Sequence, residues 1–353
     1  MATLYEKVYA CLAASRVASA MGAVVEGFSP EKIRDTYGFV DRFYPYEHFA
    51  ERGIRWMREP GTTEDGIERQ NLLSRAIIAK QDRISCEDFA RTLLECLDPE
   101  KMVYTSMPDD LKALNYLRAG VPAVEIGHLC DRSGRNGLAR AGQPIGLINA
   151  ADPGGAVRDC FDVGRVWFAP RDSALVWGSV YVAAVAEALR PQATVELTVA
   201  AGISFAPDPV KQEIQRAVHI ATRSSDWEAM RAEFYKIYSG IGTAGAFAMA
   251  AETVSKAFAV FVHSQGDVKK AILTAVNFGR DTDCLGAMAG GLAGALSGAA
   301  TLPAEWVEQV DAATAVNPYT NTKWTVKRHA DGFLSALQSR ARKMRELASI
   351  LEE

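Results

Sequence analysis

The sequence predicts an all-α protein, and three observations support this fold class. Apolar residues recur at the i, i+3, i+4 spacing of amphipathic or buried helices through most of the chain. The strict alternation of polar and apolar residues that marks a strand is almost absent. No segment of about 20 to 50 residues repeats, which argues against a solenoid. With 353 residues, 48% of them hydrophobic, the chain can bury a large core, and we expect one helical domain over residues 1–353.

The predicted helices follow one another from the N-terminus. The first covers residues 4–21, where Val8, Leu12 and Ser15 share a face of small or apolar side chains. Further helices are predicted over residues 66–80, 86–97, 110–119, 173–190, 192–202, 207–222, 226–238 and 244–262. Together they leave two long stretches without a helical pattern.

These two stretches, residues 22–65 and 131–165, are rich in Gly, Pro, Arg and Asp. Long irregular stretches inside a helical domain are usually functional loops or disordered segments. The first contains many aromatic residues, which disfavours disorder, and Tyr46 and Trp56 are candidates for stacking on a base. We therefore expect the two stretches to form the mouth of a site.

The last part of the chain begins with a helix of unusual composition. Residues 284–304 carry no charge and are long enough in principle to cross a bilayer. They are mostly Gly, Ala and Ser, however, and acids flank both ends, which favours a helix packed tightly inside the protein. Residues 303–353 are expected to form C-terminal capping helices. The charged, amphipathic tail from Arg328 to Glu353 either caps the domain or joins subunits, so a homo-oligomer stays open.

Composition excludes several classes of function. A net charge of −4 and a pI near 5.9 argue against a nucleic-acid binder, which must neutralise phosphates. The six cysteines are scattered without a C-x-x-C pair, as in a cytosolic protein with reduced thiols. The N-terminus carries an acid and a base before any long apolar run, unlike a signal peptide. We expect a cytoplasmic protein without a nucleic-acid or membrane partner.

Three short segments carry the candidate chemistry. They contain Glu26 in residues 22–27, Thr63, Glu64 and Asp65 in residues 61–66, and Asp281 and Asp283 in residues 279–284. In an extended turn, residues two apart point the same way, so Asp281 and Asp283 can converge on one point. Two such charges are unfavourable unless a cation neutralises them. Oxygen ligands favour Mg²⁺, Mn²⁺ or Ca²⁺, and the absence of an H-E-x-x-H motif disfavours zinc.

Each segment also has an ordinary structural interpretation. Thr62 and Asp65 have the spacing of a capping box, and acids such as Asp281 are common at the start of a helix. Glu26 alone is typical of a solvated loop acid. The cation site therefore depends on the three segments coming together.

The order of these segments resembles the ADP-ribosylglycohydrolase family over roughly residues 5–300. Gly22 followed by Glu26 is similar to the end of the family's first helix. Residues 63–65 match its Thr-Asp-Asp triplet, and residues 136–144 are similar to its N-G-x-x-M-R-x-x-P loop. Residues 279–284 match the closing G-x-D-x-D motif, and the Gly/Ala helix follows them.

The resemblance implies an all-α fold with two Mg²⁺ ions in a central cleft. It gives as ligands Thr63, Glu64, Asp65, Asp281 and Asp283, with Cys284 at the position of a hydroxyl ligand. It also implies that Glu26 touches the substrate ribose. Further substrate-binding candidates are Gly134, Asn136 and Gly137, whose loop would cradle phosphate through backbone N–H groups, and Arg140, which keeps a family arginine.

The sequence departs from the family pattern at several positions. Glu64 stands where the family has Asp, which lengthens one ligand by a methylene, and Ser19 replaces an early Asp. Cys284 puts a thiol, a poor partner for Mg²⁺, in place of a hydroxyl. These departures concern the second metal site and the choice of substrate.

The function implied is magnesium-dependent hydrolysis of an N-glycosidic bond to ribose, with Mn²⁺ as an alternative ion. Such a hydrolase must orient the ribose and activate a water, and the candidates for accepting the water proton are Glu26, Asp65 and Asp281. By resemblance the reaction removes ADP-ribose from a modified substrate. Two alternatives stay open: an N-glycosidase of a small nucleoside-like or ribosylated metabolite, and a catalytically silent binding or structural relative.

Overall fold

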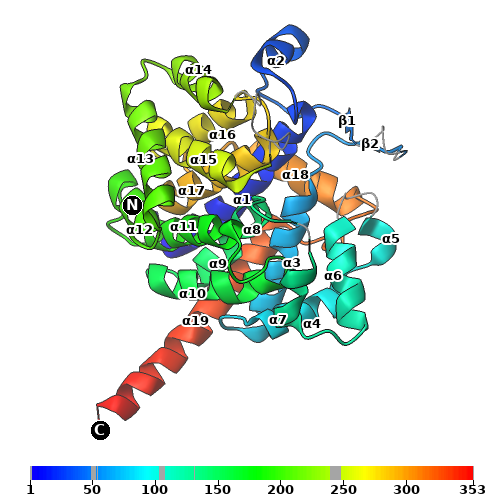
Figure 1. Ribbon diagram of the computed structural model, residues 1–353, viewed down its shortest axis with the longest axis vertical. Helices are drawn as coiled ribbons and strands as arrows, with labels where there is room; N and C mark the ends of the chain where they lie inside the picture. Colours follow the sequence, from blue (N-terminus) through cyan, green and yellow to red (C-terminus); the bar gives the residue numbers. More distant parts are fainter. Residues whose placement is uncertain are drawn as a thin grey trace.

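A pair of antiparallel helices, α1 (Leu4–Gly22) and α17 (Thr282–Ser297), forms the centre of the fold. The computed structural model describes residues 2–48, 53, 55–102, 108–130, 132–238 and 248–352. Other helices surround this pair on all sides, so both α1 and α17 are buried over most of their length (Figure 1). The all-α fold class is thereby confirmed.

Glycines let α1 and α17 approach closely. A Cβ atom placed at Gly286, Gly290 or Gly294 would lie 3.0, 3.1 or 2.4 Å from atoms of Ala18, Ala14 or Ala10, respectively. Glycine and alanine, four residues apart on each helix, thus face one another along the whole contact. The composition of residues 284–297 is explained by this packing.

The same packing bears on the question of a membrane. Within the described residues, the one helical stretch apolar and long enough to cross a bilayer is Leu4–Val25, which is α1 with the short η1 (Ala23–Val25). Of its most apolar window, 94% is buried inside the protein. The core helix of a folded domain has these properties.

The chain adds the remaining elements around this pair. The helices are α2 (Pro30–Tyr37), α3 (Asp65–Lys80), α4 (Cys86–Cys96), α5 (Pro99–Met102), α6 (Pro108–Arg118), α7 (Ala123–Ile126), η3 (Gly127–Leu129), α8 (Gly137–Ala141), α9 (Gln143–Ile148), α10 (Pro153–Val163), η4 (Gly164–Val166), α11 (Ser173–Ala188), α12 (Val195–Ser204), α13 (Asp208–Arg223), α14 (Trp227–Ile237), α15 (Ala250–Ser264), α16 (Val268–Val276), α18 (Ala304–Val316) and α19 (Val326–Leu351). Two short strands, β1 (Tyr46–Glu47) and β2 (Met57–Arg58), pair antiparallel.

Most of the predicted helices are confirmed within a few residues. The helix predicted over residues 192–202 is shifted and becomes α12. Residues 244–247 of the helix predicted over 244–262 lie outside the described residues, and the described helix there begins at Ala250. Residues 22–65 contain one helix of ordinary length, α2, between irregular segments.

The prediction that residues 131–165 form a loop is wrong, because α8, α9 and α10 occupy most of residues 137–163. α8 and α9, with five and six residues, complete too few turns to show a periodic pattern, and α10 begins with Pro-Gly-Gly, which is typical of a loop. Gly142 separates α8 from α9, and a Cβ at this position would lie 2.7 Å from Val182 on α11. Glycine is required here by close helix packing.

A buried polar network fixes how α3, α9 and α11 sit around the central pair. The Gln143 side-chain nitrogen lies 3.3 Å from Ser15 Oγ on α1, 3.1 Å from the Tyr181 hydroxyl on α11 and 3.3 Å from the Ala287 carbonyl on α17. Gln70 on α3 donates to the same Ser15 oxygen at 3.1 Å. Because an unpaired buried polar group is unfavourable, these bonds select one register among the helices.

The glycine contact predicts a specific sensitivity to added volume. Gly294→Ala forces α1 and α17 apart, because the new methyl group meets backbone atoms that cannot move alone, and we expect a loss of about 1–3 kcal/mol in the free energy of unfolding. Urea denaturation followed by circular dichroism measures this loss. The matched control is Gly154→Ala in α10, where the nearest atom is 3.7 Å away, and the change should be neutral or stabilising. Equal effects of the two substitutions would contradict this account.

Candidate functional site

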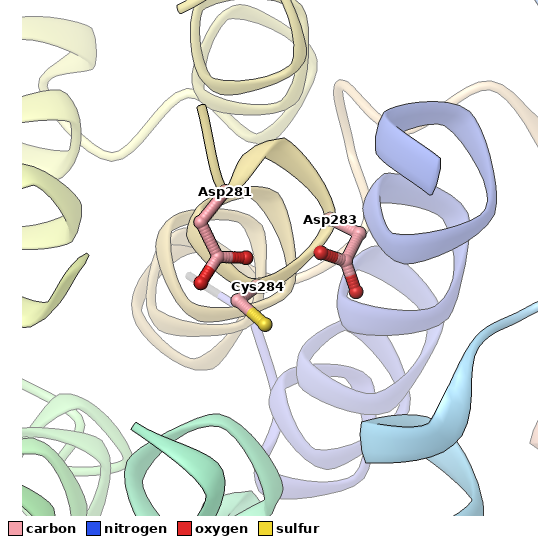
Figure 2. Close-up of side chains that lie close together, drawn as sticks. All are labelled: Asp281, Asp283 and Cys284. Atoms are coloured by element: carbon pink, nitrogen blue, oxygen red, sulfur yellow. The ribbon is translucent and has the colours of Figure 1, made fainter. Parts of the chain in front are cut away.

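Asp281, Asp283 and Cys284 gather at the first turn of α17. Their ligand atoms lie within 4.8 Å of one another, and all three side chains are buried. Figure 2 shows the two carboxyl groups and the sulfur facing a common space. Asp281 is the N-cap residue of α17, yet its side chain makes no capping hydrogen bond. The interpretation of Asp281 as an ordinary helix cap therefore fails.

The two carboxyl groups are only partly satisfied by the protein. Oδ1 of Asp281 and Oδ1 of Asp283 are buried and have no hydrogen-bond partner. Burial and the neighbouring Asp283 carboxylate raise the pKa of Asp281 well above its ordinary value. Burial and the same acids raise the pKa of the Cys284 thiol. Two open carboxylate oxygens in a buried acidic cluster fit a hard divalent cation.

Asn136 and Arg140 bind the other oxygens of these two acids. The Asn136 side chain donates to Asp281 Oδ2 at 2.7 Å, and Arg140 donates to Asp283 Oδ2 at 2.8 Å and to Ser19 at 2.9 Å. Arg140 is 1% exposed and packs directly over Gly66, where a Cβ would lie 1.8 Å from its guanidinium. The glycine after Asp65 is thus needed to let the arginine reach Asp283.

The turn before α17 has a strained backbone that fixes Asp281. Arg280 has φ 65°, an unfavourable conformation for a residue with a side chain. Its backbone exchanges hydrogen bonds with the segment after η1: its N–H donates to Phe28 at 2.9 Å, and its carbonyl accepts from Gly27 at 2.7 Å. Its guanidinium forms a bidentate pair with Glu252 on α15, at 2.6 and 2.9 Å. These contacts hold Arg280 in place and thereby set the position of its neighbour.

Glu64 is held by a shell of side chains around β1 and β2. Its Oε1 accepts from the Tyr46 hydroxyl at 2.6 Å and lies 3.1 Å from Arg58 and 3.5 Å from His48. Glu64 is the N-cap residue of α3 and makes no side-chain capping bond, so the capping box expected from Thr62 and Asp65 is wrong. Since the Tyr46 ring is buried and its hydroxyl is engaged, it is not free to stack on a base.

Asp65 is positioned by a chain of buried charges. Arg69, one turn along α3, donates to Asp65 at 2.6 Å and to the fully buried Asp110 at 2.8 Å. Asp110 also accepts from the Trp167 ring nitrogen at 2.8 Å. Burial opposes ionisation of Asp65, but the guanidinium groups of Arg69, Arg140 and Arg132 outweigh it and hold its pKa below the ordinary value. Asp65 therefore remains a carboxylate.

Glu26 lies where η1 ends, with its side chain 20% exposed and 3.3 Å from His48. Burial and the nearby acids Asp283, Asp281, Glu64 and Asp65 raise its pKa well above the ordinary value. The carboxyl groups predicted from three distant segments thus act on one another in one region. Glu64 and Asp65 lie outside the compact group of three ligand atoms, and Thr63 is half-buried beside them.

The loop expected to hold phosphate is partly occupied by protein contacts. The N–H of Gly134 donates to Asp172 at 2.9 Å, and the N–H of Asn136 donates to the Ala248 carbonyl at 3.0 Å. Gly137 begins α8. Two of the three backbone groups in this prediction therefore have partners within the chain, and the Asn136 side chain contacts Asp281 instead.

Several residues of the site were missed in the sequence. His48 and Arg58 contact the candidate acids Glu26 and Glu64 only because the fold brings them there. Asp110 and Glu252 likewise hold Arg69 and Arg280, and no local pattern marks any of the four. Arg69 could have been found, because it stands four residues after Asp65 on the same helix, a spacing that favours an ion pair.

Comparisons with known proteins agree with this architecture. A family model described as ADP-ribosylglycohydrolase matches residues 1–339. A solved structure described as an "ADP-ribosylglycohydrolase-related protein complex" superposes with a TM-score of 0.66 at 17% sequence identity, covering 95% of this chain and 98% of that chain. At this identity the likeness shows the fold alone. None of the curated proteins matches the sequence.

The open carboxylate oxygens predict direct metal binding. Titration calorimetry with MgCl₂ should detect binding to the wild-type chain, and Asp281→Asn or Asp283→Asn should remove it, because each replaces a charged ligand with a neutral amide. Asp226→Asn is the control, because it removes one negative charge at the exposed start of α14. Identical titrations of wild type and both site variants would show that these carboxyl groups hold no ion.

Proposed function

The chain belongs to the ADP-ribosylglycohydrolase family, and from this premise we propose that it is a magnesium-dependent hydrolase that removes ADP-ribose from a modified substrate by cleaving an N-glycosidic bond. The proposal rests mainly on the buried Asp281 and Asp283 oxygens that have no partners. These two acids, with Glu64 and Asp65, also lie near enough to Glu26 to raise its pKa. Five acids in one region are unfavourable in a purely structural role.

We assign Asp281 and Asp283 as the principal metal ligands, with Thr63, Asp65 and Cys284 as further ligand candidates. Glu64 is a weaker candidate, because its Oε1 is already engaged by Tyr46 and Arg58. Oxygen donors favour Mg²⁺, and Mn²⁺ is the alternative. A bound ion would supply the positive charge that can orient ribose hydroxyls and lower the pKa of a water.

The protein's own groups divide the remaining tasks. A raised pKa suits proton transfer near neutral pH, so we assign Glu26, which is partly open to solvent, as the group that takes the proton from the attacking water. Asp65 has a lowered pKa, which suits a permanent carboxylate that orients ligands. Asn136 and Arg140 orient Asp281 and Asp283 through the hydrogen bonds described above.

A second substrate class is favoured by one observation. Because the N–H groups of Gly134 and Asn136 donate within the chain, this loop offers fewer free donors to a pyrophosphate than the resemblance implies. An N-glycosidase of a small nucleoside-like or ribosylated metabolite would need no such donors. The other alternative is a silent relative that kept the fold and lost catalysis, and a chain that binds no metal would favour it.

We also propose a cytoplasmic location. Cys11, Cys86, Cys160 and Cys284 are buried free thiols, which supports a reducing compartment.

The assignment of Asp281 predicts the outcome of its neutral substitution. Asp281→Asn should abolish hydrolysis of ADP-ribosyl-arginine while helicity by circular dichroism stays unchanged, because the amide keeps the shape of the side chain and loses its charge. Asp226→Asn serves again as the control and should hydrolyse normally. Normal hydrolysis by the Asp281→Asn variant would contradict the proposed mechanism.

Cys284 predicts a gain rather than a loss. Cys284→Ser replaces a soft thiol with a hard hydroxyl of similar size, so Mg²⁺ should bind more tightly in calorimetry. Cys284→Ala is the matched control, since it removes the thiol without adding an oxygen. If Ser and Ala give the same affinity as the native thiol, Cys284 is not a ligand.

The two substrate classes can be separated directly. Hydrolysis of ADP-ribosyl-arginine and of simple N-ribosides should be compared with and without Mg²⁺ on the same preparation. Metal-dependent cleavage of the ADP-ribosyl compound supports the main proposal, whereas cleavage of N-ribosides alone supports the metabolite alternative. Metal-independent cleavage of either compound would contradict the role given to the carboxyl cluster.

A further inference from the structure

The C-terminal helix α19 (Val326–Leu351) extends beyond the folded body. Its first part packs on the core through Val326, His329, Ala330, Phe333 and Ala336. From residue 342 to residue 350 every side chain is exposed. Lys343 still reaches the body through an ion pair with Asp82 at 2.7 Å, and in Figure 1 the helix beyond it projects away from the body.

The projecting part carries an apolar stripe. Met344, Leu347, Ile350 and Leu351 are 59%, 57%, 67% and 77% exposed. At about 100° per residue, Met344, Leu347 and Leu351 fall on one face of the helix, and Ala348 lies at the edge of this face beside Met344. Exposed apolar side chains gathered on one face are typical of an interaction surface. A projecting helix with such a face therefore calls for a partner.

The charges beside the stripe match a second copy of the same helix in one orientation. Arg345 and Glu352 fall on one flank of the stripe, seven residues apart, and Lys343 falls on the other flank. When two identical helices pack antiparallel, equivalent flanks meet. Arg345 of each copy then lies level with Glu352 of the other, twice by symmetry. Parallel packing would instead place Arg345 beside the flank of Lys343, which is already paired with Asp82 at 2.7 Å and offers no opposite charge.

The position of the body favours the same orientation. Packed helices lie about 8–10 Å apart, so two parallel copies would force both folded bodies into the same space at one end. Antiparallel copies place the bodies at opposite ends of the contact. We propose that residues 342–352, the end of α19 with its C-cap residue Glu352, form a self-association surface that packs antiparallel against the same residues of a second copy of this chain.

The proposal predicts a weak, symmetric dimer, because one short helical stripe buries little area. Sedimentation of the full chain over a concentration series should show the mass rising from 38.3 kDa toward twice that value. The double variant Met344→Glu, Leu347→Glu should stay at the monomer mass, and Ser349→Glu, on the opposite face, should still dimerise. A wild-type chain that stays monomeric throughout assigns the stripe to a different protein or a lipid surface and overturns the proposal.

A charge exchange tests the orientation. Arg345→Glu and Glu352→Arg should each raise the dissociation constant about tenfold, because each places like charges opposite one another. The double variant should recover the wild-type value. All these residues are exposed, so circular dichroism should stay unchanged and exclude unfolding as the cause. Single variants without effect, or a double variant without recovery, would overturn antiparallel packing.

Discussion

The close contact between α1 and α17 is the constraint on which the site depends. The contact runs from Ala10 and Gly294 to the point where Gly22 ends α1 and Thr282 begins α17. There a Cβ on Gly22 would lie 2.6 Å from the Thr282 carbonyl, and the Thr282 hydroxyl donates to the Gly22 carbonyl at 2.8 Å. Residues 23–28 follow α1 at this junction, so Glu26 lies close to Asp281 and Asp283. Small side chains in the core thus determine which acids meet.

Buried arginines make this concentration of acids tolerable. Arg140 contacts Asp283, Arg69 joins Asp65 to Asp110, Arg58 contacts Glu64, and Arg280 pairs with Glu252 beside the cluster. Each buried ion pair offsets part of the desolvation penalty of its partners, and removal of one partner leaves a strongly unfavourable charge. Arg140 binds one oxygen of Asp283 and the Asn136 amide binds one oxygen of Asp281, which leaves the other oxygen of each acid without a partner. The same arrangement therefore orders the two acids and leaves free the oxygens that are proposed to hold a cation.

Much of this architecture could be predicted from the sequence, because it follows from local patterns. Helical periodicity identified most of the long helices, and the run of Gly and Ala after Asp283 identified a packed core helix. The family was recognised from the order of its motifs and is confirmed by the match over residues 1–339. Helices of five or six residues, such as α8 and α9, could not be predicted, because glycine interrupts them before a period repeats.

The partners of the candidate acids could not be predicted for a different reason. The sequence predicts Glu64 as a metal ligand. In the fold, Tyr46 and Arg58 bind its carboxylate, and they reach it because β1 pairs with β2. The pairing of Arg140 with Asp283 joins residues 143 positions apart. It also requires a glycine at Gly66, which in the sequence looks only like the start of a helix. Local patterns identify the groups that can react, whereas only the tertiary fold determines which of them are already occupied.

The contact between Arg140 and Asp283 also bears on the strength of the proposed metal site. The guanidinium is an internal counter-ion that already neutralises part of the charge of Asp283. A cation bound as proposed would share that carboxylate with a resident positive charge, which would weaken the hold of Asp283 on the ion.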